Sequence, residues 1–190
     1  MQSEAVLDLF RKSGALLEGH FLLTSGQHSE RYLQSALVLQ FPELAQSLGS
    51  ALASRTAHLQ PTAVLSPALG GLIIGHEVAR ALGVRALFAE RVNGALTLRR
   101  GFSLAPDDRV LIVEDVITTG GSTRETADVA SAAGASVLGA ASIVDRGSDP
   151  GRLSLPLFAL VHLQVPAYAP ESCPMCARNI PAVKPGSRAT

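Results

Sequence analysis

The sequence predicts an α/β protein with a mainly parallel central sheet and helices on both of its faces. Short, wholly apolar segments alternate with longer segments in which apolar residues recur at helical spacing. Apolar strands without alternating polar residues are typical of a parallel sheet that is covered on both sides. Hydrophobic residues make up 47% of the 190 residues and charged residues 17%, which suits one globular domain with a substantial core.

The individual elements follow from these patterns in chain order. Helical spacing predicts four helices, at residues 3–13, 42–57, 71–82 and 122–133. Apolar runs between turn residues predict six strands, at residues 21–23, 31–38, 63–65, 85–89, 110–113 and 136–144. Pro42 suits the first position of a helix, and Gly83 and Gly134 suit the position that ends one. Asn93-Gly94 predicts a two-residue hairpin.

We expect residues 1–165 to form a single domain, with residues 1–40 including the segments of a small cap (hood). Residues 166–190 hold five of the eleven prolines and read as an irregular extension. This division predicts one catalytic or binding unit with an appended tail.

The extension carries Cys173 and Cys176 with the C-x-x-C spacing of half a zinc site. A second subunit could supply the other two ligands, or His162 could help. A redox pair fits poorly because the motif lies in a proline-rich segment, and a structural turn is the interpretation that we favour. The remaining histidines show no ligand spacing and are not predicted to be catalytic: His20, His28, His58 and His76.

Composition excludes several classes of function. Sixteen basic residues balance sixteen acidic ones, so the broad positive field of a non-specific nucleic-acid binder is absent. No run of about 18 apolar residues predicts a membrane span. The first residues lack a signal-peptide pattern, and two cysteines make no disulfide framework. We therefore expect a soluble, cytoplasmic protein that binds neither nucleic acid nor membrane.

The most informative segment follows the strand predicted at 110–113. Glu114 and Asp115 stand at its carboxyl end, and Thr-Thr-Gly-Gly-Ser-Thr at 118–123 leads directly into a helix. In an open α/β sheet, ligands bind beyond the carboxyl ends of the strands. Two glycines let the backbone approach a ligand, and N–H groups at the start of a helix attract a phosphate. The carboxylates could accept hydrogen bonds from vicinal ribose hydroxyls or hold a divalent cation.

Other nucleotide-binding loops fit less well, since no G-x-x-x-x-G-K-[S/T] occurs and residues 70–75 lack the G-x-G-x-x-G spacing. The complete segment 113–123 strongly resembles the signature with which type I phosphoribosyltransferases bind phosphoribosyl pyrophosphate (PRPP). The resemblance implies their fold, transfer of a phosphoribosyl group to a nitrogenous base, and Mg²⁺ carried by the pyrophosphate. It implies a ribose-binding role for Glu114 and Asp115, which makes these two acidic residues the candidate catalytic residues. It implies that PRPP contacts Glu114, Asp115, Val116, Ile117, Thr118, Thr119, Gly120, Gly121 and Ser122.

Two further segments indicate which base is used. Residues 19–29 look like the base-covering cap of orotate phosphoribosyltransferases, which implies that Ser25 and Gly26 contact orotate; the alternative is a simple turn. Arg146, in Asp145-Arg146-Gly147 after the last predicted strand, matches an arginine that contacts the base in that family. A guanidinium can donate two parallel hydrogen bonds to the orotate carboxylate. Thr118 joins this implied orotate site, and the alternative for Arg146 is an ordinary surface arginine.

The chain departs from the better-studied branch of that family and looks closest to its compact bacterial branch. The lysines of that branch are missing at three places: before the Ser-Gly turn, in the pyrophosphate loop and in the mobile loop. Thr24 occupies the first place, and residues 88–102, which correspond to the mobile loop, contain no lysine and no histidine. Because pyrophosphate departure needs cationic or donor groups, we hypothesise that one or more of Arg91, Arg99 and Arg100 replace these lysines, with Arg91 and Arg99 as the first candidates. The alternative is that the arginines merely solvate a hairpin.

The sequence thus predicts transfer of the 5-phosphoribosyl group from PRPP to orotate in pyrimidine (UMP) biosynthesis, with Mg²⁺ and, by family resemblance, as a homodimer. A purine phosphoribosyltransferase is the nearest alternative, because the PRPP loop is common to both. A non-catalytic PRPP-sensing regulator on the same fold is a third possibility.

Overall fold

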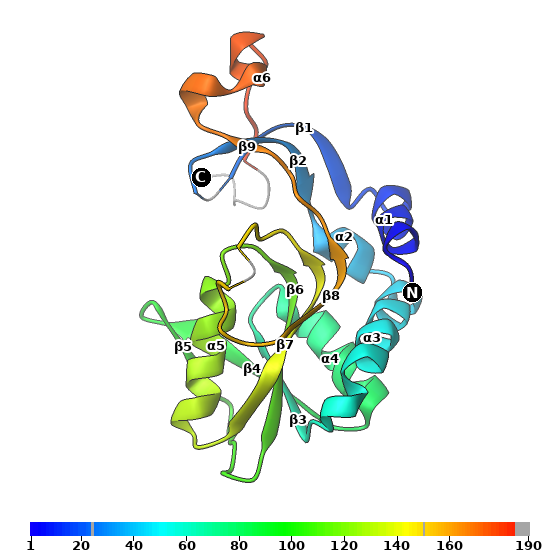
Figure 1. The fold of residues 1–190 in the computed structure, drawn as a ribbon, viewed down its shortest axis with the longest axis vertical. Helices are drawn as coiled ribbons and strands as arrows, with labels where there is room; N and C mark the ends of the chain where they lie inside the picture. Colours follow the sequence, from blue (N-terminus) through cyan, green and yellow to red (C-terminus); the bar gives the residue numbers. More distant parts are fainter. Residues whose placement is uncertain (24, 150, 185–190) are drawn as a thin grey trace.

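A six-stranded sheet lies at the centre of the structure, a computed structural model that describes residues 1–23, 25–149 and 151–184 (Figure 1). The strands are ordered β5-β4-β3-β6-β7-β8. Their bounds are Ala63–Pro67 for β3, Arg85–Val92 for β4, Ala95–Leu98 for β5, Arg109–Ile117 for β6, Ser136–Asp145 for β7 and Leu157–His162 for β8. All neighbours pair in parallel except β4 and β5. This confirms the predicted, mainly parallel sheet.

The antiparallel pair β4–β5 is the predicted hairpin. Asn93 and Gly94 form its two-residue turn, with φ of 50° and 88°. Two positive φ angles in succession favour asparagine and glycine over other residues.

Helices cover both faces of the sheet. One face packs with α3 (Pro42–Thr56) and α4 (Gly71–Leu82) around a core that includes Leu48, Ile74 and Leu111. The other face packs with α5 (Gly121–Ala132) around Leu65, Ile112 and Ala130. The inner strand β3 is therefore buried along its whole length, as its apolar sequence predicts.

A second, three-stranded sheet lies above the carboxyl ends of the central strands (Figure 1). It consists of β1 (Leu16–Leu22), β2 (His28–Leu33) and β9 (Ala167–Tyr168), and we call it the hood. α1 (Ser3–Lys12) precedes it, and the short segments η2 (Pro170–Ser172) and α6 (Pro174–Ala177) follow β9. The hood thus combines the two ends of the chain.

Several details differ from the sequence prediction; for example, β1 begins at Leu16 rather than at residue 21. Residues 35–38, predicted as strand, belong to the helix α2 (Ser35–Leu39), which buries Val38 and Leu39 in the core. β6 continues through Glu114 and Asp115 to Ile117 because β7 pairs with it that far. β8 was not predicted; parallel pairing with β7 stabilises it at the sheet edge. Short elements of this kind depend on tertiary packing, which local sequence patterns do not reveal.

Within the described residues, no helix combines the length and the apolar character that crossing a membrane requires.

Candidate active site

The end of β6 and the first turn of α5 are joined through Glu114. Its Oε1 accepts a hydrogen bond from Ser122 Oγ and its Oε2 accepts one from Thr123 Oγ, both at 2.6 Å. Burial raises the pKa of the Glu114 carboxyl, and the two hydroxyl donors only partly oppose this shift. Glu114 therefore fixes the start of α5 relative to the sheet.

The loop between β6 and α5 turns at Gly120, which has φ of 75°. A side chain there would be strained and would also collide with Leu153. The first N–H groups of α5, at Gly121 and Ser122, have no intrahelical acceptor, as at the start of any helix, and the residue that precedes the helix makes no side-chain cap hydrogen bond. Thr118 and Thr119 are exposed at the same turn. This is the arrangement that binds a phosphate at a helix N-terminus.

Asp115 points to the opposite side of β6 from Glu114, as neighbouring residues of a strand do. Its Oδ1 lies 2.7 Å from the position that a β-carbon on Gly70 would occupy. Glycine at residue 70 therefore lets the loop after β3 pass close to the Asp115 carboxylate in its present position. Burial raises the pKa of Asp115, against the opposing effect of the Val116 backbone N–H. Val116 and Ile117 complete the strand by pairing with β7.

Arg146 follows β7, and its backbone N–H donates to Ile117 O at 2.8 Å, next to the phosphate loop. Its Nε is buried and has no hydrogen-bond partner in the described part of the chain. Burial lowers the pKa of Arg146, although an arginine remains charged at neutral pH; the nearby Tyr32 opposes the shift. A buried cationic donor without a partner costs free energy, so it marks a position where a ligand would bind.

The residues after Arg146 support the phosphate loop from the side. Arg152 donates to Asp145 Oδ1, and the pair is nearly buried, with 9% and 6% of the side chains exposed. Arg124 donates to Thr119 O at 2.9 Å and to Arg152 O at 2.7 Å. Sequence patterns missed this connection, because Arg124, Asp145 and Arg152 have no distinctive spacing.

The hood contributes Tyr32, whose ring lies 5.9 Å from that of the buried Phe21. Sequence reasoning did not select Tyr32, which pairs with Leu17 in the β1–β2 hairpin. Ser25 and Gly26 are exposed in the turn of this hairpin, where Gly26 N–H donates to Leu23 O at 2.9 Å. The Thr24 position lies outside the described residues.

The three hairpin arginines differ in their partners. Arg91 pairs with Glu125 of α5 at 2.8 Å and donates to Gly94 O. Arg100 pairs with Glu90 at 2.7 Å. Arg99 is exposed, and its side chain makes no ion pair or hydrogen bond with the described residues, although its charge helps Arg100 to lower the pKa of Glu90. Arg99 is thus the hairpin cation that is available to a ligand.

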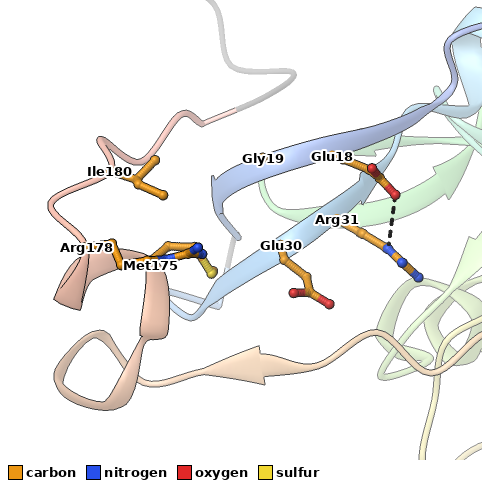
Figure 2. A pocket seen from close by; sticks show the side chains of 7 residues that line it. All are labelled: Glu18, Gly19, Glu30, Arg31, Met175, Arg178 and Ile180. Carbon is orange, nitrogen blue, oxygen red and sulfur yellow. Dashed lines mark ion pairs between the residues drawn. The ribbon is translucent and has the colours of Figure 1, made fainter.

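A hollow of about 300 Å³ lies on the hood rather than at the phosphate loop (Figure 2). Glu18 of β1 and Arg31 of β2 face each other there at 3.6 Å. Its lining residues are Glu18, Gly19, Glu30, Arg31, Met175, Arg178 and Ile180. None of them belongs to the acidic pair, the phosphate loop or the Arg146 segment, so this hollow is distinct from the candidate active site.

His20 and His28 show no ligand spacing in the sequence, but the fold places them together. The β1–β2 hairpin brings the two rings together, and Cys173 and Cys176 lie beside them. Antiparallel pairing makes neighbours of residues whose separation in the chain matches no metal motif. His162, which the sequence offered as a further ligand, is not part of this cluster; its Nδ1 lies 3.1 Å from Asp145 Oδ2.

Comparison with known proteins places the chain among related sequences over nearly its whole length. Residues 37–160 match the phosphoribosyl transferase domain family. An orotate phosphoribosyltransferase from Pelotomaculum thermopropionicum is 54% identical, with 99% of both chains covered. One from Heliobacterium modesticaldum is 50% identical over 99% of this chain and 100% of that protein.

Solved structures show the same fold. An orotate phosphoribosyltransferase from Aeropyrum pernix is 27% identical, with a TM-score of 0.68, over 83% of this chain and 93% of that one. An adenine phosphoribosyltransferase from Thermoanaerobacter pseudethanolicus is 16% identical with a TM-score of 0.62, over 70% of this chain and 88% of that one. Because enzymes of both kinds share the fold, the fold alone does not select the base.

Proposed function

The chain belongs to the orotate phosphoribosyltransferase family, and from this premise we propose that it transfers the 5-phosphoribosyl group from PRPP to orotate. The products are orotidine 5′-monophosphate and pyrophosphate, a step of pyrimidine biosynthesis.

The observation that carries the choice of orotate is the Nε of Arg146, which is buried and has no hydrogen-bond partner among the described residues. Arg146 stands at the carboxyl end of β7, one strand away from the phosphate loop and near Tyr32 of the hood. A base bearing a carboxylate would satisfy this guanidinium by a charge-assisted pair of hydrogen bonds. A purine offers no carboxylate, so it would leave the partly buried guanidinium without this compensation.

Each of the other site residues then has a specific role. The N–H groups of 119–122 and the hydroxyls of Thr118 and Thr119 bind the 5′-phosphate. Asp115 accepts hydrogen bonds from the ribose hydroxyls. Glu114 holds Ser122 and Thr123, and each of its oxygens keeps a lone pair for a ribose hydroxyl. Thr118, Ser25 and Gly26 complete the orotate side.

The chain's contribution to the reaction is positioning and charge stabilisation. The bond from ribose C1 to pyrophosphate breaks while a ring nitrogen of orotate attacks C1, and positive charge develops on the ribose. Asp115 and Glu114 are the nearby carboxylates that stabilise that charge. Arg99 is placed on an exposed hairpin from which it can neutralise the departing pyrophosphate.

Mg²⁺ is the cofactor that we propose, bound mainly by the pyrophosphate of PRPP. Among the described residues, the one group of three or more metal-binding side chains is the His/Cys cluster of the hood, so the acidic pair is no complete magnesium cage. Mg²⁺ usually combines one or two carboxylates with substrate phosphates, and Asp115 is suited to that part. The ion would neutralise the charge of the leaving group.

We further propose a homodimer located in the cytoplasm, with residues 1–165 as the catalytic domain and 166–190 as its extension. A molar mass near twice the 19.8 kDa of the chain in light scattering would support the dimer.

A base-panel assay tests the proposed activity. The protein is incubated with PRPP, Mg²⁺ and one of orotate, adenine, hypoxanthine, guanine or uracil, and pyrophosphate release is measured. We expect release with orotate alone. Turnover with a purine but not orotate would contradict the choice of base. PRPP binding without turnover on any base would instead indicate a regulator.

A further inference from the structure

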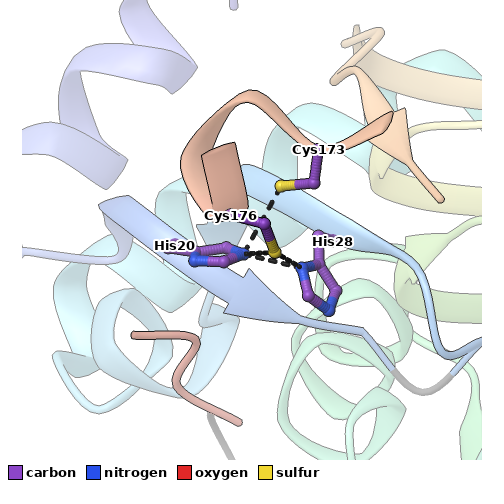
Figure 3. Close-up of side chains that lie close together, drawn as sticks. All are labelled: His20, His28, Cys173 and Cys176. Carbon is purple, nitrogen blue, oxygen red and sulfur yellow. Dashed lines mark hydrogen bonds between the residues drawn. The ribbon is translucent and has the colours of Figure 1, made fainter. Parts of the chain in front are cut away.

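Four side chains from opposite ends of the chain meet in the hood (Figure 3). His20 comes from β1, His28 from the start of β2, and Cys173 and Cys176 from the start of α6. Their four donor atoms all lie within 4.8 Å of one another. His20 and Cys173 are buried, with 4% and 3% of their surface exposed.

The distances between these atoms match those of a tetrahedral zinc site. Zn–N bonds of about 2.0–2.1 Å and Zn–S bonds of about 2.3 Å place ligand atoms roughly 3.3–3.8 Å apart. His20 Nε2 lies 3.5 Å from Cys173 Sγ and 3.8 Å from Cys176 Sγ, and His28 Nδ1 lies 3.2 Å from Cys176 Sγ. The two ring nitrogens are closer, at 2.7 Å, so they would separate by roughly half an ångström around an ion.

His20 is held in the tautomer that a metal requires. Its Nδ1 lies 2.6 Å from Ile180 O, and a carbonyl oxygen can only accept a hydrogen bond. The hydrogen of a neutral His20 ring therefore resides on Nδ1, which leaves the lone pair of Nε2 directed at the cysteines. Orientation of a ligating histidine through its other nitrogen is a usual feature of metal sites.

The surrounding segments are too small to form a core of their own. β9 has two residues, η2 has three and α6 has four. Backbone hydrogen bonds attach the tail to the hood at Val183, which donates to His20 O and accepts from Leu22 N, both at 2.8 Å. Small, loop-rich units of this kind usually need a metal or disulfides for stability.

We propose that His20, His28, Cys173 and Cys176 bind one structural Zn²⁺ that fastens the C-terminal segment to the β1–β2 hairpin. Four protein ligands leave no open position, so the ion stabilises the hood rather than reacting with substrate. The hairpin fixed in this way carries Ser25 and Gly26. This site is independent of orotate transfer and would stand if that assignment failed.

Metal analysis of the purified, tag-free protein tests the proposal. We expect about one zinc per chain by mass spectrometry after Zn²⁺ reconstitution and desalting. Cys173→Ser and His28→Ala should each lose at least about tenfold in zinc affinity, a typical consequence of losing ligand contacts. His76→Ala, which alters an exposed histidine on α4, is the matched control and should retain full zinc.

A second measurement keeps the test decisive if a variant folds poorly. Co²⁺ added to the metal-free wild-type protein should give the intense visible absorption of a tetrahedral, thiolate-bound ion, and zinc should protect both thiols from alkylation. Wild-type protein that takes up neither zinc nor Co²⁺, or two cysteines found as a disulfide, would overturn the proposal. Chelation should also lower the unfolding temperature of wild-type protein and leave that of Cys173→Ser unchanged.

Discussion

Asp108 at the amino end of the central sheet and the candidate site residues at its carboxyl end differ in how their charges are compensated. At the amino end, Asp108 accepts hydrogen bonds from Ala105 N–H at 2.8 Å, Arg85 at 2.7 and 2.8 Å, and Thr62 at 3.1 Å. These partners, the Ala105 N–H first, lower the pKa of Asp108. At the carboxyl end, burial raises the pKa values of Glu114 and Asp115 and leaves Arg146 with an unpaired Nε.

The difference separates structural from functional charges. A charged group whose partners are all present contributes to folding, whereas a buried charged group without them costs free energy that a ligand can recover. The amino end should therefore govern stability, and the carboxyl end should govern binding and turnover. Substitutions at each end test this division.

Among substitutions of the acidic residues and of the hairpin, the largest effect on kcat/KM is expected for Asp115→Asn. Loss of charge-assisted hydrogen bonds to ribose, worth about 2 kcal/mol, should lower kcat/KM by roughly 30-fold. The folded-state pKa of Asp115 is raised, so ionisation costs stability above the unfolded pKa, and the unfolding temperature at pH 7 should stay equal or rise. Steady-state kinetics and calorimetry measure both quantities. A large loss of stability with unchanged kinetics would reverse the assignment of this end.

At the amino end, Asp108→Asn should destabilise the protein by roughly 1.5 kcal/mol, because it weakens a charge-assisted network. The pKa of Asp108 is lowered by folding, so its contribution is present above an unfolded pKa of about 3.9 and disappears as pH falls through the folded value. Urea denaturation at pH 7 and pH 3 measures this difference. kcat/KM should remain within about twofold of wild type; a tenfold loss would refute the division.

A smaller effect is expected for the arginines of the β4–β5 hairpin. Arg99→Ala should lower turnover about tenfold, or roughly 1.4 kcal/mol of barrier. Arg91→Ala should have less effect, since its partner is Glu125. Glu125→Gln removes the ion pair with Arg91 but keeps both arginines, so it is the control for loss of that ion pair. Should single-turnover rates of both arginine variants match wild type, the hairpin would not cover the leaving group.

The phosphate loop and the His/Cys cluster also differ in how far the sequence revealed them. The phosphate loop is contiguous, so residues 113–123 indicated PRPP binding, and the parallel sheet and the hairpin at Asn93-Gly94 followed from local patterns. Local patterns ended the strand before Glu114, whereas β6 continues through it. Its burial there is possible because the hydroxyls of Ser122 and Thr123 in α5 donate to it, and contacts across eight and nine positions are not visible in a local pattern.

The His/Cys cluster was missed because it depends on tertiary contacts. His20 and Cys173 are 153 positions apart, and the proline-rich tail resembled an irregular extension. Pairing of β2 with β9 brings these segments together. A half-motif such as C-x-x-C therefore indicates a site, while its remaining ligands can be found only in the fold.

The most direct test of the central claim is the discrimination between orotate and uracil, which differ by the carboxylate. Wild-type protein should use orotate with a kcat/KM at least about 100-fold higher than uracil, and Arg146→Met should lose most of that ratio. Arg80→Met, an exposed arginine on α4, is the matched control and should preserve the ratio. An Arg146→Met variant that still prefers orotate by the wild-type ratio would contradict the account.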